Sequence, residues 1–347
     1  MAYKYTKRIS LGYADDGTLI RKRVYANSKA ELDRRIHDVL SEYEKAPLSS
    51  DITFQEYATT WLNTYKSAKE AATKEMYTNI LRKTEDIDYM SMKDIRQADL
   101  QLLINDNSEH PNVCSKMRLT FRQIWACAVE EGILSTDVTK RLEVPKTSVT
   151  QGRALTDEEK QAIKDANLTD MERLYVSLLY YLGVRPQEAL AFCSGDVADG
   201  HATVERAVGF DGNRPYIKPT KTGNTRKIPI PDALQELLDN YHADSYLIHN
   251  KDGDLMSKTV KSDFWLSIKH KIEQAIIAKH PEYKDYKSTL RPYTFRHNYC
   301  TMCYYSKLSL KKCQYLMGHS SIQMIMQVYA HLDDEQEPLD SIKSMKM

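Results

Sequence analysis

The sequence predicts a multidomain, mainly α-helical protein: a small N-terminal β-sheet plus helix, an all-helical domain, and a larger mixed α+β domain. Three observations predict this fold class. The chain has 347 residues, enough for two or three domains. A Ser or Thr followed three positions later by Glu, the signature of a helix start, occurs at Ser28, Thr53 and Thr156. Short runs rich in Val, Ile, Tyr and Thr occur near the N-terminus and between residues 202 and 230.

The N-terminal domain is expected to span residues 1–47 and to read strand, turn, strand, helix. Residues 4–13 and 18–26 have the composition of strands, and Asp15-Asp16-Gly17 between them favours a hairpin turn. The second strand carries the basic run Arg21, Lys22 and Arg23. Such a strand fits a surface that binds nucleic acid, and it fits a solvated charged face equally well.

The second domain is expected over residues 51–145 and to be all helical. Its first helix follows Thr53 and places apolar residues at helical spacing, which indicates a buried face. Further helices are predicted around 76–81, 98–104 and 112–131, the last preceded by Pro111 and closed by Gly132. Residues 46–50 and 144–152 have the composition of linkers on either side.

The third domain is expected over residues 153–347, with a C-terminal tail from about 332. The capping box at Thr156 opens a mostly helical pattern that is interrupted by strands at 202–208, 216–218 and 226–230. Turns that contain glycine separate these strands, and they place Lys221 at a hairpin tip.

Composition narrows the class of protein. No apolar run approaches the roughly 20 residues needed to cross a bilayer, and the N-terminus lacks a secretory signal, so a cytoplasmic protein is expected. Six cysteines suit that compartment, and we expect neither disulfides nor a bound metal or other cofactor. Net charge is only +1, but residues 1–30, 201–230 and 280–312 each hold six or seven Lys and Arg against two acidic residues. Local clusters of this kind indicate contacts with an anionic partner.

The last domain carries the residues with chemical potential. No P-loop, Rossmann glycine pattern, GxSxG elbow or HExxH motif is present. Instead, arginine, lysine and histidine occur in short motifs in a fixed order. They are Gly183-Val184-Arg185-Pro186-Gln187-Glu188, Lys221 before Thr222-Gly223-Asn224, Tyr293-Thr294-Phe295-Arg296-His297 and Gly318-His319, followed by Tyr329.

These motifs resemble the catalytic domain of the tyrosine recombinase (phage integrase) family over roughly residues 153–335. That family's pattern is an arginine in Gly-x-Arg-x-x-Glu, a lysine on a β-hairpin, a His-x-x-Arg box, a Gly-His box and a tyrosine about ten residues later. Four of the five elements match in order and approximate spacing. The helical domain resembles the family's core-binding (SAM-like) domain, and the N-terminal sheet resembles the arm-binding domain of integrases that hold two kinds of DNA site.

The resemblance implies a site-specific recombinase that cleaves and rejoins DNA through a 3′-phosphotyrosine, with Tyr329 as nucleophile. Guanidinium groups suit the developing charge on a phosphodiester because they stay charged and donate in pairs, so Arg185 and Arg296 are expected to clamp the phosphate. Lys221 is expected to protonate the leaving 5′-oxygen. His319 would donate to the phosphate or help to take the phenolic proton.

One position departs from the family pattern. Tyr293 stands where the second box begins with histidine, and a phenol with an ordinary pKa near 10 is a poor base at neutral pH. More of the proton transfer would therefore fall to Lys221 and His319, with Lys218 as the fallback for the lysine. Glu188 and His297 are expected to support the site rather than react.

The implied biology is integration and excision of a phage or conjugative transposon, by a homotetramer on double-stranded DNA in a bacterial cytoplasm, associated with the nucleoid. An excisionase and a DNA-bending protein are the implied further partners. Phosphate contacts are expected from Arg21, Lys22, Arg23, Lys218 and Arg226. The alternatives are a Xer-like resolvase, a type IB topoisomerase-like enzyme, and a catalytically silent DNA-binding relative.

Overall fold

The computed structural model describes residues 5–13, 19–44, 51–146, 152–243, 245–323, 325–326 and 328–329. The predicted turn at 15–17, the linker at 46–50, most of the second linker and the tail from 332 lie outside these residues. The chain divides into two compact units, and the division between residues 147 and 148 falls inside the second predicted linker. Residues 69–76 group with the second unit. The three-domain boundaries themselves stay a prediction.

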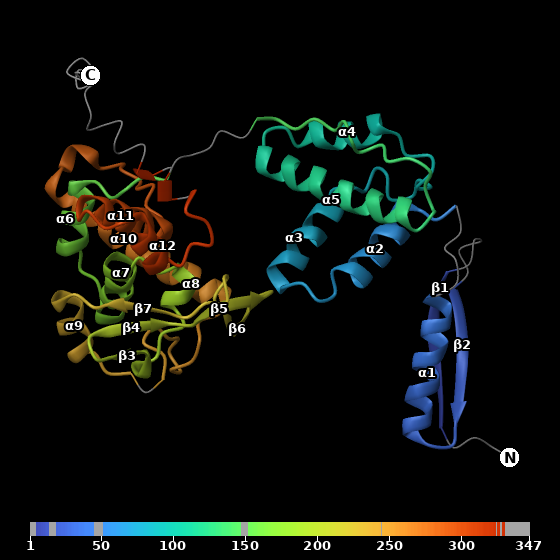
Figure 1. Cartoon of the computed structure of the whole chain (residues 1–347), viewed down its shortest axis with the longest axis horizontal. Helices are drawn as coiled ribbons and strands as arrows, with labels where there is room; N and C mark the ends of the chain where they lie inside the picture. The colour runs from blue at the N-terminus through green and yellow to red at the C-terminus, as the bar shows by residue number, and fades with distance from the viewer. Residues whose placement is uncertain are drawn as a thin grey trace, which may run out of the picture. The chain divides into compact units, whose positions relative to one another are not determined.

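The N-terminal segment is a hairpin backed by one helix (Figure 1). Strand β1 (Tyr5–Tyr13) pairs antiparallel with β2 (Leu19–Ala26), and α1 (Lys29–Glu44) packs against both. Ile9, Val24, Ala26 and Leu32 form its small core. The helix start resembles the predicted capping box: the Glu31 N–H donates to the Ser28 hydroxyl, while the Glu31 carboxylate accepts from the preceding N–H of Asn27.

Four helices follow along the chain: α2 (Phe54–Tyr65), α3 (Ala71–Leu81), α4 (Gln97–Asp106) and α5 (Pro111–Glu130). The Thr53 capping box is formed as predicted, with both reciprocal hydrogen bonds present. Aromatic rings of α2 and α5 fill the core, where Phe54 stacks on Trp125 and meets Phe121 edge-on. The apolar stripe on α2 is therefore core, as expected.

The second unit is built around the central helices α7 (Asp170–Leu182), α10 (Lys258–Lys279) and α11 (Pro292–Tyr305). Helix α11 packs against α7, and α10 packs against α6 (Asp157–Asp165) (Figure 1). The short helices of this unit are α8 (Pro186–Ala189), α9 (Asp232–Asp239) and α12 (Leu310–Met317). Two single-turn 3₁₀ helices, Ser194–Asp196 and Pro281–Tyr283, complete it. Across the described part of the chain, no helix has both the length and the apolar character required to cross a membrane.

Two small sheets correct the predicted strand pattern. Residues 202–208 are not one strand: β4 (His201–Val204) ends before Glu205, and β5 (Arg206–Asp211) begins after it in another sheet. Strand β4 lies between β3 (Val197–Ala198) and β7 (Arg226–Pro229), while β5 pairs with β6 (Arg214–Pro219). The chain changes sheets twice, which places the β6–β7 connection between the two sheets rather than at the end of a hairpin.

Candidate active site

A cavity of about 570 Å³ in the second unit gathers most of the predicted site residues. It is bounded by side chains from the α7–α8 corner, the β6–β7 connection, α11 and the end of α12. Its lining residues are Arg185, Lys221, Thr222, Asn224, Tyr293, Arg296, His297, Cys300, Met317, His319, Ser320 and Val328. Segments more than 100 residues apart in the sequence thus converge on one cavity that is rich in cationic side chains.

Arg185 is held in place by the turn that ends α7. Gly183 closes that helix in the left-handed conformation (φ +58°), and a Cβ there would lie 2.3 Å from the Tyr299 ring, so the turn depends on glycine. Arg185 then caps α8: its N–H and its Nη1 both donate to the Glu188 carboxylate, at 2.9 and 2.8 Å. Its Nη2 donates to the Gly318 carbonyl at 2.9 Å, so the guanidinium is rigidly oriented toward the cavity.

Arg296 lies deeper, and its side chain is almost fully buried. Its Nη1 donates to the Gly183 carbonyl at 2.8 Å and its Nη2 donates to the Met317 carbonyl. Burial lowers the pKa of Arg296 to about 9, with a further contribution from the positive charge of Arg185, so the group stays charged at neutral pH. Both predicted phosphate-binding arginines therefore line one cavity as cations.

The Glu188 carboxylate is the anion that joins these cations. It is 2% exposed and accepts from Arg185 and from Arg226, whose Nη2 lies 2.6 Å from Oε2. Burial acts to raise the pKa of Glu188, but the hydrogen bonds and charge of Arg226, followed by those of Arg185, outweigh burial and hold that pKa below its ordinary value. Glu188 therefore contacts two arginines and is not among the residues that line the cavity, a position that fits the supporting role expected of it.

Arg226 was expected among the DNA-contacting residues, and the structure corrects this expectation. It is the first residue of β7, is 3% exposed, and all of its hydrogen bonds that we observe are made to Glu188 and to the Leu316 carbonyl. The strand alternates buried and exposed side chains, so Arg226 faces inward with Ile228. Sequence reasoning missed its place in the site, although this period-two pattern was a signal that could have found it.

His319 lies just after α12, whose C-terminus is closed by Gly318 in the left-handed conformation (φ +63°). Its Nδ1 is buried and has no hydrogen-bond partner among the described residues. Burial lowers the pKa of His319 to about 4, and the charges of Arg296 and Arg185 contribute further. The imidazole is therefore neutral at physiological pH, able to accept a proton or to donate from one nitrogen.

Lys221 lines the cavity, but it does not occupy a hairpin tip as predicted. It lies in the connection from β6 to β7, two strands that pair with other partners. The connection turns at Gly223 (φ +69°), whose N–H donates to the Thr220 carbonyl at 2.9 Å. The lysine is solvent-exposed on this turn, next to the cavity-lining Thr222 and Asn224.

Tyr293 and His297 both come from the first turns of α11. Tyr293 is 46% exposed and lines the cavity mouth, in the place where the family pattern has histidine. His297 is partly buried, and its ring fills the space beside Gly152, where an added Cβ would lie 2.1 Å from it. Burial lowers the pKa of His297, with a smaller effect from Arg296, so this imidazole is also neutral.

Tyr329 is adjacent to the cavity-lining Val328, but its own side chain packs against the core instead. Its ring meets Tyr304 edge-on with centroids 5.0 Å apart, and its hydroxyl is buried without a hydrogen-bond partner in the described part of the chain. Burial raises the pKa of Tyr329, and the neighbouring Cys313 thiol adds to this effect. The phenol is therefore protonated and withdrawn.

The remaining predicted residues are not among those that line this cavity. Lys22 and Arg23 are exposed on β2, and Arg23 pairs directly opposite Arg8 of β1. The backbone of Arg21 pairs with that of Ser10, and its side chain lies outside the described part. Lys218 is partly exposed on β6.

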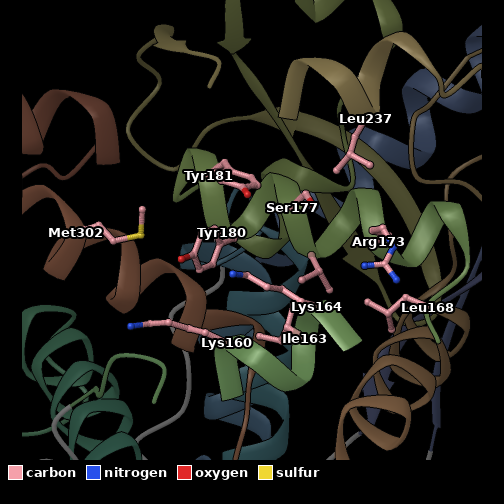
Figure 2. A pocket seen from close by; sticks show the side chains of 11 residues that line it. Lys160, Ile163, Lys164, Leu168, Arg173, Ser177, Tyr180, Tyr181, Leu237 and Met302 are labelled. Carbon is pink, nitrogen blue, oxygen red and sulfur yellow. The ribbon is translucent and has the colours of Figure 1, made fainter. Parts of the chain in front are cut away.

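A second cavity, of about 380 Å³, lies between α6 and α7 and shares no lining residue with the first. Figure 2 shows Lys160 and Lys164 of α6 on the same side as the apolar Ile163, with Arg173 of α7 farther along. Arg173 is hydrogen-bonded to the backbone, since its Nη2 donates to the Ala166 carbonyl at 2.9 Å. The described lining combines cations with tyrosines and aliphatic groups and holds none of the predicted catalytic residues.

Comparisons with known proteins identify the family of this chain. The profile described as "Phage integrase family" matches residues 153–336, and "Phage integrase, N-terminal SAM-like domain" matches residues 53–107. A "Tyrosine recombinase XerD" of Ralstonia nicotianae is 25% identical over 74% of this chain and 77% of its own. A "Tyrosine recombinase XerC-like" protein of Caldanaerobacter subterraneus is 23% identical over 96% of this chain and 93% of its own.

Two solved structures show the same fold. The Tn1549 transposon integrase in complex with transposon right end DNA has a TM-score of 0.68 at 16% identity, over 84% of this chain and 98% of that one. A lambda integrase dimer bound to a COC′ core site has a TM-score of 0.62 at 15% identity, over 96% of this chain and 94% of that one. Since the family profile covers more than half of the sequence, the chain belongs to the phage integrase family and is a tyrosine recombinase, an enzyme that cleaves and rejoins DNA.

Proposed function

We propose that this recombinase attacks a DNA phosphodiester with Tyr329 while Arg185, Arg296 and His319 hold the scissile phosphate and Lys221 protonates the leaving oxygen. The observation that carries the proposal is the cavity itself, which places two fixed guanidiniums, a neutral imidazole and an exposed lysine around one space. Two preorganised cations match the charge that develops on the non-bridging oxygens.

The proposed cleavage step balances without an outside energy source. The Tyr329 oxygen forms a bond to phosphorus, the bond from phosphorus to the 5′-oxygen breaks, and Lys221 donates a proton to that oxygen. The phenolic proton leaves to the neutral His319 or to water. Because the 3′-phosphotyrosine conserves the phosphodiester's bond energy, attack by a 5′-hydroxyl reverses the step and rejoins the strand.

The withdrawn hydroxyl of Tyr329 implies a resting state. In the described structure the phenol packs against Tyr304 and is not among the groups that line the cavity. Cleavage therefore requires Tyr329 to leave this packing and enter the cavity after DNA fills it. The residue loses one aromatic contact in this movement, which is a small cost compared with the binding energy that DNA supplies.

The biological role we propose is integration and excision of a mobile element by a homotetramer that acts in the bacterial cytoplasm. Support comes from neighbours in the same fold: the Tn1549 transposon integrase bound to circular intermediate DNA, and a lambda integrase tetramer bound to a Holliday junction. Arg23 and Arg8 lie opposite one another on the N-terminal hairpin. Like charges in that register destabilise a free sheet and favour a bound anion, so the hairpin would contact a second DNA site.

An excisionase and a DNA-bending protein would set the direction of the reaction. A resolvase is the second candidate, because the curated relatives are named XerC and XerD recombinases. Recombination of plasmids separates the two roles. An integrase joins two different attachment sites and should lose activity when the N-terminal hairpin is deleted. A resolvase acts on two identical sites and should tolerate deletion of this hairpin.

A nicked suicide duplex tests the chemistry. The duplex carries the element end that flanks this gene, with a nick just 3′ of the cleavage point, so that the short fragment with the released 5′-hydroxyl diffuses away and cannot rejoin. The wild-type protein should give an SDS-stable protein–DNA adduct, and Tyr329→Phe should give none. Tyr304→Phe and Tyr305→Phe, the two neighbouring tyrosines, are matched controls that should still form it. An adduct that persists in Tyr329→Phe removes the proposed nucleophile, and binding without any wild-type adduct favours a silent DNA-binding relative.

A further inference from the structure

The C-terminal end of α12 is bound by three arginines at three successive carbonyls. Arg226 Nε donates to Leu316 at 2.8 Å, Arg296 donates to Met317, and Arg185 donates to Gly318 at 2.9 Å. The last carbonyls of a helix have no partner within the helix and carry its negative dipole end. These arginines therefore replace the missing hydrogen bonds of α12 and fix the residue that follows, His319.

The three arginines differ in what else they reach. Arg185 and Arg296 line the cavity, whereas Arg226 does not. Arg226 is instead the stronger partner of Glu188: its Nη1 and Nη2 lie 3.3 and 2.6 Å from the two carboxylate oxygens. Both side chains of this ion pair are buried, since that of Arg226 is 3% exposed and that of Glu188 is 1% exposed. Arg226 is thus the only one of the three whose described contacts are all internal.

Charge in this cluster depends on Arg226. Glu188 carries one negative charge, and Arg185, Arg226 and Arg296 carry three positive charges, which leaves a net charge of two positive units around the cavity. Without Arg226 the net charge would be one, and the buried Glu188 would keep only Arg185 as a partner. A buried carboxylate that has only one cation as a partner holds this cation more tightly. The charge of Glu188 would then offset that of Arg185 and draw its guanidinium away from the phosphate.

Gly318 brings Arg226 into direct contact with the Gly-His turn. A Cβ at Gly318 would lie 2.9 Å from Arg226 Nη1 and 3.1 Å from its Cζ. The guanidinium therefore packs directly under the backbone that presents His319. Any shift of Arg226 is transmitted to this turn, because protein interiors are close-packed and leave no slack.

We propose that Arg226 is a positioning residue for strand cleavage: it neutralises Glu188 and anchors the end of α12, which leaves Arg185 charged for the phosphate and holds His319 in place. The inference rests on the proposed roles of Arg185 and His319. Arg226 itself touches neither DNA nor the reacting atoms. Its effect therefore depends on the charge of the phosphate, which gives the role a signature that a merely structural residue lacks.

The test measures the single-turnover rate of adduct formation at saturating DNA on two nicked duplexes. One carries the natural phosphodiester at the cleavage position, and the other carries a methylphosphonate, in which a neutral methyl group replaces one charged oxygen. Arg226→Met should slow adduct formation on the phosphodiester by roughly 10- to 100-fold, the range of coupling between contacting groups. On the methylphosphonate the loss should shrink to within about threefold, because less charge needs to be held.

Matched variants separate positioning from folding. Arg206→Met removes another strand arginine paired with a carboxylate, Asp196, away from the cavity, and should keep the wild-type rate. Arg226→Lys keeps the charge beside Glu188 and should recover most of the rate. If Arg226→Met unfolds, as shown by thermal denaturation, Arg226→Met combined with Glu188→Gln removes both charges at once and keeps two net positive charges around the cavity. This double variant should be folded and should cleave the phosphodiester within about tenfold of the wild-type rate.

Four outcomes would overturn the inference: an unchanged rate in a folded Arg226→Met, an equal loss on both duplexes in that variant, an Arg226→Lys variant no faster than Arg226→Met, or, where Arg226→Met unfolds, a folded double variant that is slower than about tenfold below wild type on the phosphodiester. These differ from a failure of the proposed function, which Tyr329→Phe reports. An adduct in Tyr329→Phe removes the nucleophile, whereas wild-type cleavage that is insensitive to Arg226 leaves the nucleophile in place and removes only its positioning role.

Discussion

Two parts of the proposed catalytic machinery differ in how far they are assembled. The proposed phosphate-binding part, with Arg185, Arg296 and Glu188, is in place: its donors are held by backbone carbonyls and by one buried carboxylate. The proposed nucleophile is not: the Tyr329 hydroxyl is buried without a partner among the described residues, and its ring packs on Tyr304. With these roles, we infer that phosphate binding is preorganised and attack is conditional, so that control of cleavage lies in the movement of one tyrosine.

The largest expected effect is on the assembled part. Arg185→Met removes a charged donor from the phosphate and should slow adduct formation by about 100- to 1000-fold, the usual cost of losing one preorganised donor. DNA affinity should change little, because many other phosphate contacts remain. Single-turnover kinetics and a filter-binding assay measure the two quantities. A rate within threefold of wild type would break the claim that this part is preorganised for the phosphate.

Gly183→Ala tests the turn on which that assembly depends. The left-handed backbone and the close approach of the Tyr299 ring should together cost about 2–4 kcal/mol of unfolding free energy. Urea denaturation measures it. Gly200→Ala is the matched control, because Gly200 is also left-handed but an added Cβ there would meet open space. This substitution should cost only about 1–2 kcal/mol of unfolding free energy. Equal costs for the two substitutions would show that the packing against Tyr299 is unimportant.

The neutral His319 sharpens the comparison through pH. Its pKa falls from an ordinary value near 6.5 to about 4 on folding, so between these pH values the unfolded chain binds more protons. Stability should therefore decrease as pH falls from 6.5 toward 4, by about 1–2 kcal/mol after allowance for partial solvent screening. Urea denaturation at several pH values measures this loss. His319→Gln should flatten that segment of the profile, and an unchanged slope in the variant would assign the loss to other groups.

The smallest expected effect is on the withdrawn nucleophile. Tyr304→Leu removes the edge-on ring contact, worth about 0.5–1.5 kcal/mol. If release of Tyr329 limits cleavage, adduct formation should become about 2- to 10-fold faster. Rapid-quench kinetics on the nicked duplex would show it. A slower variant would mean that Tyr304 assists the attacking position rather than the resting one.

Local patterns predicted much of this molecule. The capping boxes at Thr53 and Thr156 start helices where expected, and the ordered motifs of the last domain, Tyr329 excepted, converge on one cavity. The sequence could not show which strands pair. Lys221 was predicted at a hairpin tip because its turn joins consecutive strands, but each of those strands pairs elsewhere. Strand pairing depends on packing between distant segments, and local turn composition does not report it.

Long-range contacts set the other limit. Arg226 belongs to the site through Glu188 and Leu316, which are far from it in sequence, so a basic residue after a turn was interpreted as a DNA contact. The resting place of Tyr329 likewise depends on Tyr304 in another helix. Motif order identified the residues of the cavity, but the partners that orient or restrain them become visible only in three dimensions.

The central claim is that Tyr329 becomes covalently joined to DNA, and peptide mapping of the adduct tests it most directly. The SDS-stable complex formed on the nicked duplex would be digested with nuclease and trypsin, and the modified peptide sequenced by mass spectrometry. Trypsin cuts after Lys312 and Lys343, so the modified peptide should contain Tyr315 and Tyr329. We predict a nucleotide joined through its 3′-phosphate to Tyr329 alone. A nucleotide joined in this way to Tyr293, Tyr304, Tyr305 or Tyr315 would contradict the account.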